Sequence, residues 1–297
     1  MGKDIKHYHL CSDGEVASDL ILDDGDMYAA FNRFGICQAA VPDATVISFT
    51  VEDTHVHALL KGSQPDCVEF REKYERSTRQ HIINTRGSMS GVVLAFQLLQ
   101  ITDEDYLKNV AAYTVIQATK DGKKVMPYDY KWGTGALYFR SGEAVLPWHV
   151  GNEKPRRISE LTVRERRSLL KSRQEVPGDW LVCNGFLLPE NYIDIEAFQQ
   201  IYQTHNAFRV FQSSSKSKTQ EFQARMELAK GVMLEYSEAR SICSDMSKSM
   251  FGTRNIHSLH SYQKIKLAQA LWRQNGMSPK QISAIVYLPE DTILKVL

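Results

Sequence analysis

Two histidines separated by one residue, His55 and His57, are the side chains with the clearest potential for chemistry in this 297-residue chain. The segment from Thr54 to Leu60 is typical of a β-strand, in which successive side chains point to opposite faces. Both imidazoles then share one face while Val56 packs on the other, and two imidazoles on a rigid strand can hold one divalent metal. A purely structural role for the pair is the competing interpretation.

A tyrosine and an amide form the second candidate group. Tyr113 and Gln117 are four residues apart in a segment with helical periodicity, so they are expected on one helical face. A tyrosine can attack phosphate as a covalent nucleophile, and an amide one turn away can supply an oxygen to the same metal. The alternative is that Tyr113 belongs to a buried apolar stripe, which comprises Tyr106, Val110, Tyr113 and Ile116.

A second pair of histidines with the same spacing lies near the start of the chain. His7 and His9 are not embedded in an apolar strand of comparable quality. We therefore expect them at the surface or on an edge strand, and not in a metal site.

These motifs, with one further segment, resemble a known family. Thr54-His55-Val56-His57 before Ala58-Leu59-Leu60 resembles the His-hydrophobic-His (HUH) motif of single-tyrosine transposases, commonly Asn-His-Val/Phe-His before aliphatic residues. The segment from Ala112 to Gln117 is similar to that family's tyrosine helix, usually Tyr-Ile-x-x-Asn/Gln. Tyr130-Lys131-Trp132-Gly133-Thr134 resembles the Tyr-x-Trp-Ser-Ser segment of its REP-associated branch, and the resemblance covers residues 5–140.

The resemblance implies a DNA transposase-like enzyme, which acts as a metal-dependent single-stranded DNA endonuclease and strand transferase. Tyr113 would be the nucleophile that forms a 5′-phosphotyrosine, while His55, His57 and Gln117 would hold Mg²⁺ or Mn²⁺. The DNA partner would be single-stranded or hairpin DNA. Glu52-Asp53 replace the family's usual Met-Pro and Thr54 its Asn, which leaves the loop around the DNA and the cleavage sequence undetermined.

The elements that must position these residues follow from the periodicity of the first 120 residues. A helix is expected from Asp26 to Gly35, ended by Gly35, and another from Asp66 to Arg86. The remaining expected elements are strands at Lys6–Cys11, Thr45–Val51, Thr54–Leu60 and Val92–Ile101, and a helix opened by Thr102 and Asp105 that ends near Thr119. The order β-α-β-β-α-β-α predicts an α+β domain with a ferredoxin-like antiparallel sheet at about residues 1–140.

A basic extension and a helical region are expected after this domain. Residues 141–297 carry 21 Lys and Arg residues against 16 Asp and Glu, a net charge of +5. Residues 141–212 are predicted to form a basic, mixed helical extension, and residues 213–297 a helical domain. The spacing Ser278-Pro279-Lys280-Gln281 is typical of a helix start, and the surrounding helices resemble a helix-turn-helix.

Basic side chains in both regions are candidates for DNA binding, because Lys and Arg neutralise backbone phosphates. A solvated helix face is the competing interpretation, since acidic residues lie among them. The candidates are Arg156, Arg157, Arg164, Arg166, Arg167, Lys171, Lys280 and Lys295.

Composition restricts the class of protein. Hydrophobic residues make up 43% and charged residues 24%, as in globular chains. No apolar run reaches the roughly 18 to 20 residues of a membrane span, so no membrane partner is expected. Five widely spaced cysteines without a Cys-x-x-Cys pair argue against a disulfide framework and favour the cytoplasm.

Other functions and an assembly stay open at the level of the sequence. A DNA-binding regulator with an inactive HUH domain is the alternative function, and a metallohydrolase that uses bound water is a third. A homodimer is compatible with the sequence.

Overall fold

The chain divides into two compact units, which are described separately. The computed structural model describes residues 3–12, 20–52, 54–89, 92, 94, 96–116, 128–140, 145–211, 236–275, 277–289, 292–293 and 296. We call Met1–Lys216 the sheet unit and Ser217–Leu297 the C-terminal unit. The predicted extension, residues 141–212, falls within the same unit as the sheet.

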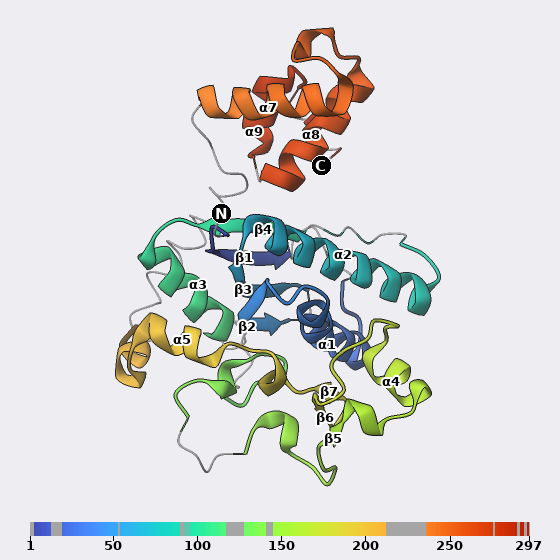
Figure 1. The fold of residues 1–297 in the computed structure, drawn as a ribbon, viewed down its shortest axis with the longest axis vertical. Coiled ribbons are helices and arrows are strands. Elements are labelled where there is room, and N and C mark those ends of the chain that lie inside the picture. Colours follow the sequence, from blue (N-terminus) through green and yellow to red (C-terminus); the bar gives the residue numbers. More distant parts are fainter. Residues whose placement is uncertain are drawn as a thin grey trace. The chain divides into compact units, whose positions relative to one another are not determined.

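A four-stranded antiparallel sheet forms the centre of the sheet unit (Figure 1). Its strands are β1 (Lys6–Ser12), β2 (Thr45–Val51), β3 (Val56–Gly62) and β4 (Phe96–Ile101), and their spatial order is β2-β3-β1-β4. The element order β1-α1-β2-β3-α2-β4-α3 agrees with the predicted alternation, and the α+β class is confirmed. Because β1 lies inside the sheet, the expectation that His7 and His9 occupy an edge strand is wrong.

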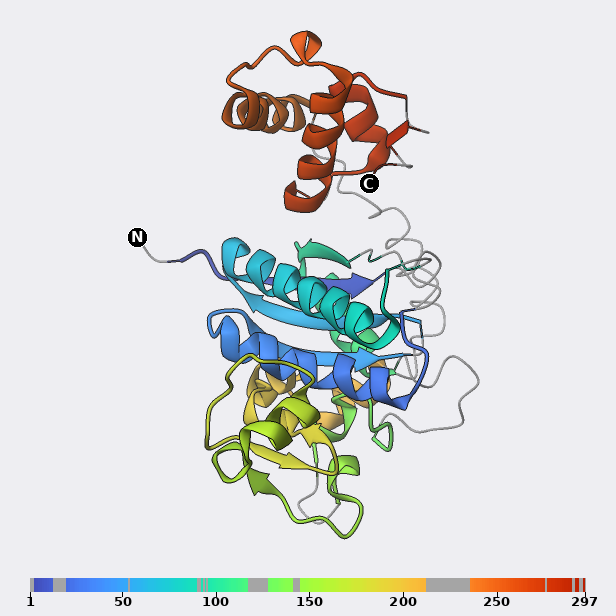
Figure 2. The same cartoon turned by 90° about the vertical axis from the view of Figure 1, so that its right-hand side faces the viewer.

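Two helices, α1 (Asp24–Ala40) and α2 (Gln64–Arg86), cover one face of the sheet (Figure 2). Aromatic side chains join these layers: Phe34 of α1 stacks on Phe49 of β2 at 4.2 Å between ring centroids, and Tyr74 of α2 meets Phe96 of β4 at 5.4 Å. The start of α2 is fixed locally, because the Ser63 hydroxyl accepts a hydrogen bond from the backbone N–H of Asp66.

A third helix, α3 (Glu104–Ile116), covers the opposite face. Its Thr114 hydroxyl lies 2.7 Å from the Ser48 hydroxyl of β2. The next residue of the strand, Phe49, packs against α1. Because successive side chains of a strand point to opposite faces, α3 lies on the face opposite α1. The helix begins with Asp103, whose carboxylate accepts from the N–H of Tyr106 at 2.7 Å, and not with the predicted Thr102–Asp105 pair.

The chain after the sheet adds short strands and helices. Asn32 of α1 accepts from the N–H of Leu187 at 2.8 Å and donates to the carbonyl of Gly185 at 2.9 Å, which joins the extension to the helix. The strands are β5 (Arg156–Arg157), β6 (Leu181–Cys183) and β7 (Phe186–Leu187), the α-helices are α4 (Val163–Leu170) and α5 (Ile195–Tyr202), and the 3-10 helices are η2 (Gly135–Leu137), η3 (Pro147–His149), η4 (Ile158–Glu160) and η5 (Pro189–Asn191). Of these elements, β7 and α4 pack against α1, while α5 packs against α3 and β2.

Gly35 does not end α1 as predicted, because the helix continues for five more residues to Ala40. Its role is close packing. A Cβ atom at this position would lie 2.7 Å from Cδ2 of Leu187 and 2.7 Å from Cε1 of Tyr192, both side chains of the extension. Glycine therefore permits the extension to approach the helix.

The C-terminal unit is helical in its described part. It comprises α7 (Tyr236–Phe251), η6 (Ile256–Ser258), α8 (Ser261–Asn275) and α9 (Pro279–Val286). Ser278 caps α9 by accepting from the N–H of Gln281, as its spacing predicts, and Leu271, Ile282 and Ile285 lie in one apolar core. Most of the segment after Pro289 lies outside the described residues. None of the described helices of either unit is long and apolar enough to span a membrane.

All five cysteines are buried, and no disulfide joins any two of these described residues. This agrees with the expectation from their spacing.

We expect Gly35→Leu to lower the free energy of unfolding of the sheet unit by about 1–3 kcal/mol, because the added side chain overlaps Leu187 and Tyr192. Leucine is a good helix former, so the loss would come from the contact and not from the helix. Urea unfolding followed by circular dichroism measures it. Glu69→Leu, at an exposed position of α2, is the control and should change stability by less than about 0.5 kcal/mol. Equal stability of Gly35→Leu and the wild type would contradict this packing.

Candidate active site

The sheet and α3 meet at His57 and Tyr113, two of the predicted site residues. His57 lies on β3 and is 3% exposed, while Tyr113 lies on α3 and is 8% exposed. Their ring centroids are 4.8 Å apart, and the rings are perpendicular at 89°. The face of the sheet that α3 covers is therefore the face that carries the candidate chemistry.

His55 lies beside His57, as the strand alternation predicts. It immediately precedes β3, and its ring centroid is 4.8 Å from that of His57. Its Nδ1 lies 2.8 Å from the Thr54 hydroxyl. Gln117, the predicted third ligand, is outside the described residues.

Glu52 adds a carboxylate to the site that no motif in the sequence predicts. Its side chain is buried, and its Oε1 lies 3.6 Å from Nε2 of His55. The backbone of Glu52 donates to the carbonyl of His55 at 2.8 Å, which closes the turn and holds the two side chains near each other. No spacing motif marks this residue, because the turn that positions it forms only when β2 pairs with β3.

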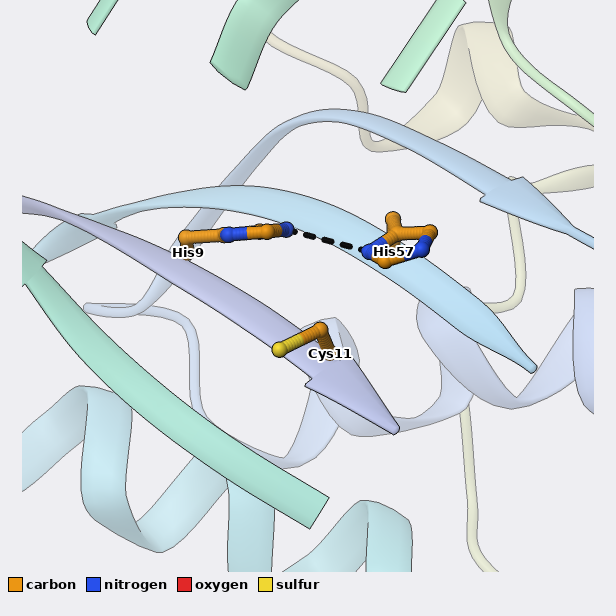
Figure 3. A group of neighbouring side chains, drawn as sticks. All are labelled: His9, Cys11 and His57. Atoms are coloured by element: carbon orange, nitrogen blue, oxygen red, sulfur yellow. Dashed lines mark hydrogen bonds between the residues drawn. The ribbon is translucent and has the colours of Figure 1, made fainter. Parts of the chain in front are cut away.

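His9 of β1 also belongs to the site, contrary to its predicted position at the surface or on an edge strand. It is completely buried, and its Nε2 lies 3.1 Å from Nδ1 of His57, within hydrogen-bonding distance (Figure 3). The two rings are stacked with centroids 5.3 Å apart. Burial lowers the pKa of His9 to about 3, so its imidazole is neutral at physiological pH.

Cys11 completes a cluster of three side chains that could hold a metal. In the register of β1 and β3 it is directly opposite His57, and one ligand atom from each of His9, Cys11 and His57 lies within 4.8 Å of the others. Figure 3 shows His9 and His57 pointing toward each other, while the sulfur of Cys11 is directed away from the line that joins them. Alternation along β1 places His9 and Cys11 on one face, and this His-x-Cys spacing is the signal that could have revealed them.

Two donor sets thus share His57. His55 and His57 with the Glu52 carboxylate offer nitrogen and oxygen, which suits Mn²⁺ and also borderline metals such as Fe²⁺ and Ni²⁺. His9, Cys11 and His57 offer nitrogen and sulfur, which suits Zn²⁺. Since Nδ1 of His57 faces His9, the nitrogen that would bind a metal beside His55 is Nε2. The residues present therefore fit a divalent transition metal better than Mg²⁺.

The other tyrosines near the motifs lie in different surroundings. The hydroxyl of Tyr130 donates to the carbonyl of Val51 at 2.7 Å, and Tyr128 lies 3.4 Å from Nε2 of His205. The segment from Tyr130 to Thr134 runs beside β2, because the N–H of Val51 donates to the carbonyl of Trp132 and the N–H of Thr134 to that of Phe49. This segment supports the strand that precedes the His55–His57 turn.

The structure separates the predicted DNA-binding residues into groups. Arg156 is engaged within the extension, since it lies 3.4 Å from the Glu165 carboxylate and donates to the carbonyl of Glu160. Arg157 and Arg164 are exposed and Arg166 is half-buried. Arg167 and Lys171 line an open groove. The side chain of Lys280 and all of Lys295 lie outside what the structure describes.

In comparisons with protein-family models, with curated proteins and with solved structures, nothing matches the chain. Its function is therefore inferred from the residues that the fold brings together. These are His55, His57 and Tyr113, with Glu52 and His9 beside them.

The two donor sets differ in an observable way. We expect the metal to bind at His55, His57 and Glu52, so that Co²⁺ bound to the protein shows no thiolate charge-transfer band. Cys11→Ser should retain the affinity for Mn²⁺ within about twofold, because sulfur is a poor ligand for Mn²⁺. His9→Ala should weaken Mn²⁺ binding by about 10–100-fold, as expected when a partner that orients a ligand is lost. Titration calorimetry and absorption spectroscopy measure both. A band that disappears in Cys11→Ser would instead assign the metal to His9, Cys11 and His57.

Proposed function

We propose that the sheet unit is a metal-dependent, single-stranded DNA endonuclease and strand transferase that uses a tyrosine nucleophile. The proximity of Tyr113 on α3 to His57 on β3 is the observation that carries the proposal. These two residues are 56 positions apart in the sequence, and the resemblance to single-tyrosine HUH transposases requires that they meet.

The arrangement of the sheet supports the same proposal. A ferredoxin-like sheet has its first and third strands at the centre, and β1 and β3 occupy the centre of the order β2-β3-β1-β4. The helix after β4 then lies over the strand that carries the histidines. The predicted fold and the predicted site are therefore compatible with each other.

In the proposed reaction the phenol oxygen of Tyr113 attacks a phosphorus of single-stranded DNA. The new O–P bond forms as the bond to the 3′ oxygen breaks, which gives a 5′-phosphotyrosine and a 3′ hydroxyl. The phenol proton leaves with a base or solvent, and the 3′ oxygen gains one proton, so the step is balanced. Attack by another 3′ hydroxyl reverses it and joins two strands.

The surrounding residues prepare this step. A divalent metal held by His55 and His57, with Gln117 as the predicted third ligand, would withdraw electron density from the scissile phosphate. His9 fixes the orientation of His57 through their 3.1 Å contact, and the Glu52 carboxylate restrains His55. Neither His9 nor Glu52 needs to touch the DNA to act in this way.

The C-terminal unit is proposed to bind DNA as a helix-turn-helix. The connection between α8 and α9 comprises only residues 276–278, and both helices bury side chains in one core. This compact pair is compatible with the proposed motif. The cysteines, buried and without disulfides, support a cytoplasmic location.

A DNA-binding regulator with an inactive HUH domain is the second candidate. The observation that favours it is the burial of Tyr113 and His57, which pack against each other as core residues do. The two functions differ in whether Tyr113 becomes covalently attached to DNA.

We expect Tyr113→Phe to abolish cleavage and the covalent adduct, because phenylalanine has no atom that can attack phosphorus. The ring remains, so the fold and DNA binding should persist. Denaturing electrophoresis of the protein with labelled single-stranded hairpin DNA and Mn²⁺ measures the adduct. Tyr106→Phe, seven residues earlier on the same helix, is the control and should retain activity. An adduct that persists in Tyr113→Phe would contradict the assignment, and no adduct with the wild type would favour the regulator.

Deletion of residues 217–297 should weaken the affinity for cognate DNA by about tenfold or more, equivalent to about 1.4 kcal/mol. The rate of cleavage at saturating DNA should change less, because all candidate catalytic residues lie in the sheet unit. Single-turnover cleavage as a function of protein concentration separates the two quantities. Unchanged affinity would show that the C-terminal unit has a role other than DNA binding.

A further inference from the structure

A basic groove lies between α2 and the segment that follows α4. Its volume is about 770 Å³, and it is separate from the site formed by His57 and Tyr113. Five basic side chains line it: Lys73 and Arg76 of α2, and Arg167, Lys171 and Arg173 of the extension. Among the described lining residues none is acidic, so the groove has a strong positive potential.

Most of these charges are not neutralised within the described part of the chain. Lys73 lies 3.5 Å from Glu69, but Arg76, Arg167, Lys171 and Arg173 form no ion pair there. The neighbouring glutamates of α2 are directed to other bases: Glu72 to Arg71 and Glu75 to Arg79. Four cations held together in one groove repel one another unless an anion binds between them.

The backbone at Lys171 adds a second indication. Lys171 ends α4 with φ at +50°, a left-handed conformation for which glycine is the favoured residue. A lysine at this position carries a conformational cost, and Lys171 lines a groove that is already positive. Residues in such conformations concentrate at binding sites.

The other lining residues indicate which anion fits. They include hydroxyl and amide side chains, such as Ser77, Gln80 and Asn84, and no phenylalanine, tyrosine or tryptophan among those described. The imidazole of His81 also lines the groove, but it is buried and lies 2.6 Å from the Asp26 carboxylate. Proteins that bind single strands stack bases on aromatic rings, whereas contacts to a duplex backbone come from basic, hydroxyl and amide groups. The groove therefore matches the sugar-phosphate backbone of a duplex.

We infer that this groove binds the backbone of double-stranded DNA, such as the stem of a hairpin, at a position remote from the chemistry. The groove lies on the side of α1 and α2, whereas Tyr113 lies under α3 on the opposite face of the sheet. The inference rests on the proposed function for its ligand, and it adds a second DNA site that α2 and the extension build together.

The test uses the full chain with Tyr113→Phe as background, so that no strand is cut. Fluorescence anisotropy measures binding of a labelled DNA hairpin over a range of salt concentrations. The groove variant combines Arg76→Ala, Arg167→Ala and Lys171→Gly, where glycine keeps the left-handed backbone. It should bind at least about tenfold more weakly, and its slope of log affinity against log salt should fall by about 2–3, since each lost phosphate contact contributes about 0.9.

The matched control removes three charges from exposed positions that are outside the groove and are not DNA-binding candidates: Arg79→Ala, Arg140→Ala and Arg209→Ala. It should bind within about threefold of the background. Equal losses in the groove and control variants would overturn the inference in favour of overall charge. A groove variant that binds the hairpin as tightly as the background does would overturn the inference outright. If the groove variant lost as much affinity for an unpaired oligonucleotide as for the hairpin, the choice of duplex DNA as the ligand would be wrong.

Failure of this inference and of the proposed function can be distinguished. With Tyr113 restored, the groove variant should still form the covalent adduct on saturating single-stranded DNA. Adduct formation together with unaltered hairpin binding would refute only the groove. Groove-dependent hairpin binding without any adduct from the wild type would refute only the proposed strand transfer.

Discussion

The pairing of β1 with β3 is the constraint on which the site depends. This register puts Cys11 opposite His57 and brings His9 within 3.1 Å of it. Because side chains alternate along a strand, a shift of one residue would turn His57 toward α1 and α2 and present Val56 to α3. The apolar residues of β3 that pack against α1 and α2 oppose such a shift, so the core on one face fixes the chemistry on the other.

Local sequence signals predict most of the helices and strands, but they do not predict all of the tertiary contacts between them. Period and caps predicted α2, the start of α9 and the strands β1, β2 and β3 to within about two residues, whereas β4 begins at Phe96 and not at the predicted Val92. Strand alternation predicted that His55 and His57 lie together. His9 was misjudged because its burial follows from the central position of β1, which depends on two pairings distant in sequence. Glu52 has no motif, and the packing role of Gly35 depends on residues about 150 positions later.

The basic residues of the extension show a similar limit. The sequence presents them as one run, but folding separates them: Arg156 pairs with Glu165, while Arg167 and Lys171 join Arg76 of α2. Charge density along the chain therefore does not reveal where a positive surface forms. The close fit of β7 against α1 at Gly35 and Asn32 holds the extension in place, so the fold of the extension and the position of the groove are coupled.

The buried cysteines allow the local opening of each unit to be measured by the chemical modification of its thiols. Burial raises the pKa of Cys37, Cys67 and Cys243 to about 12, so their thiolates, the forms that react with alkylating reagents, are scarce while the units stay closed. Cys37 and Cys67 belong to the sheet unit and Cys243 to the C-terminal unit. The rate at which each thiol becomes modified thus follows the local opening of the unit that contains it, and the two units can be followed independently in one intact chain.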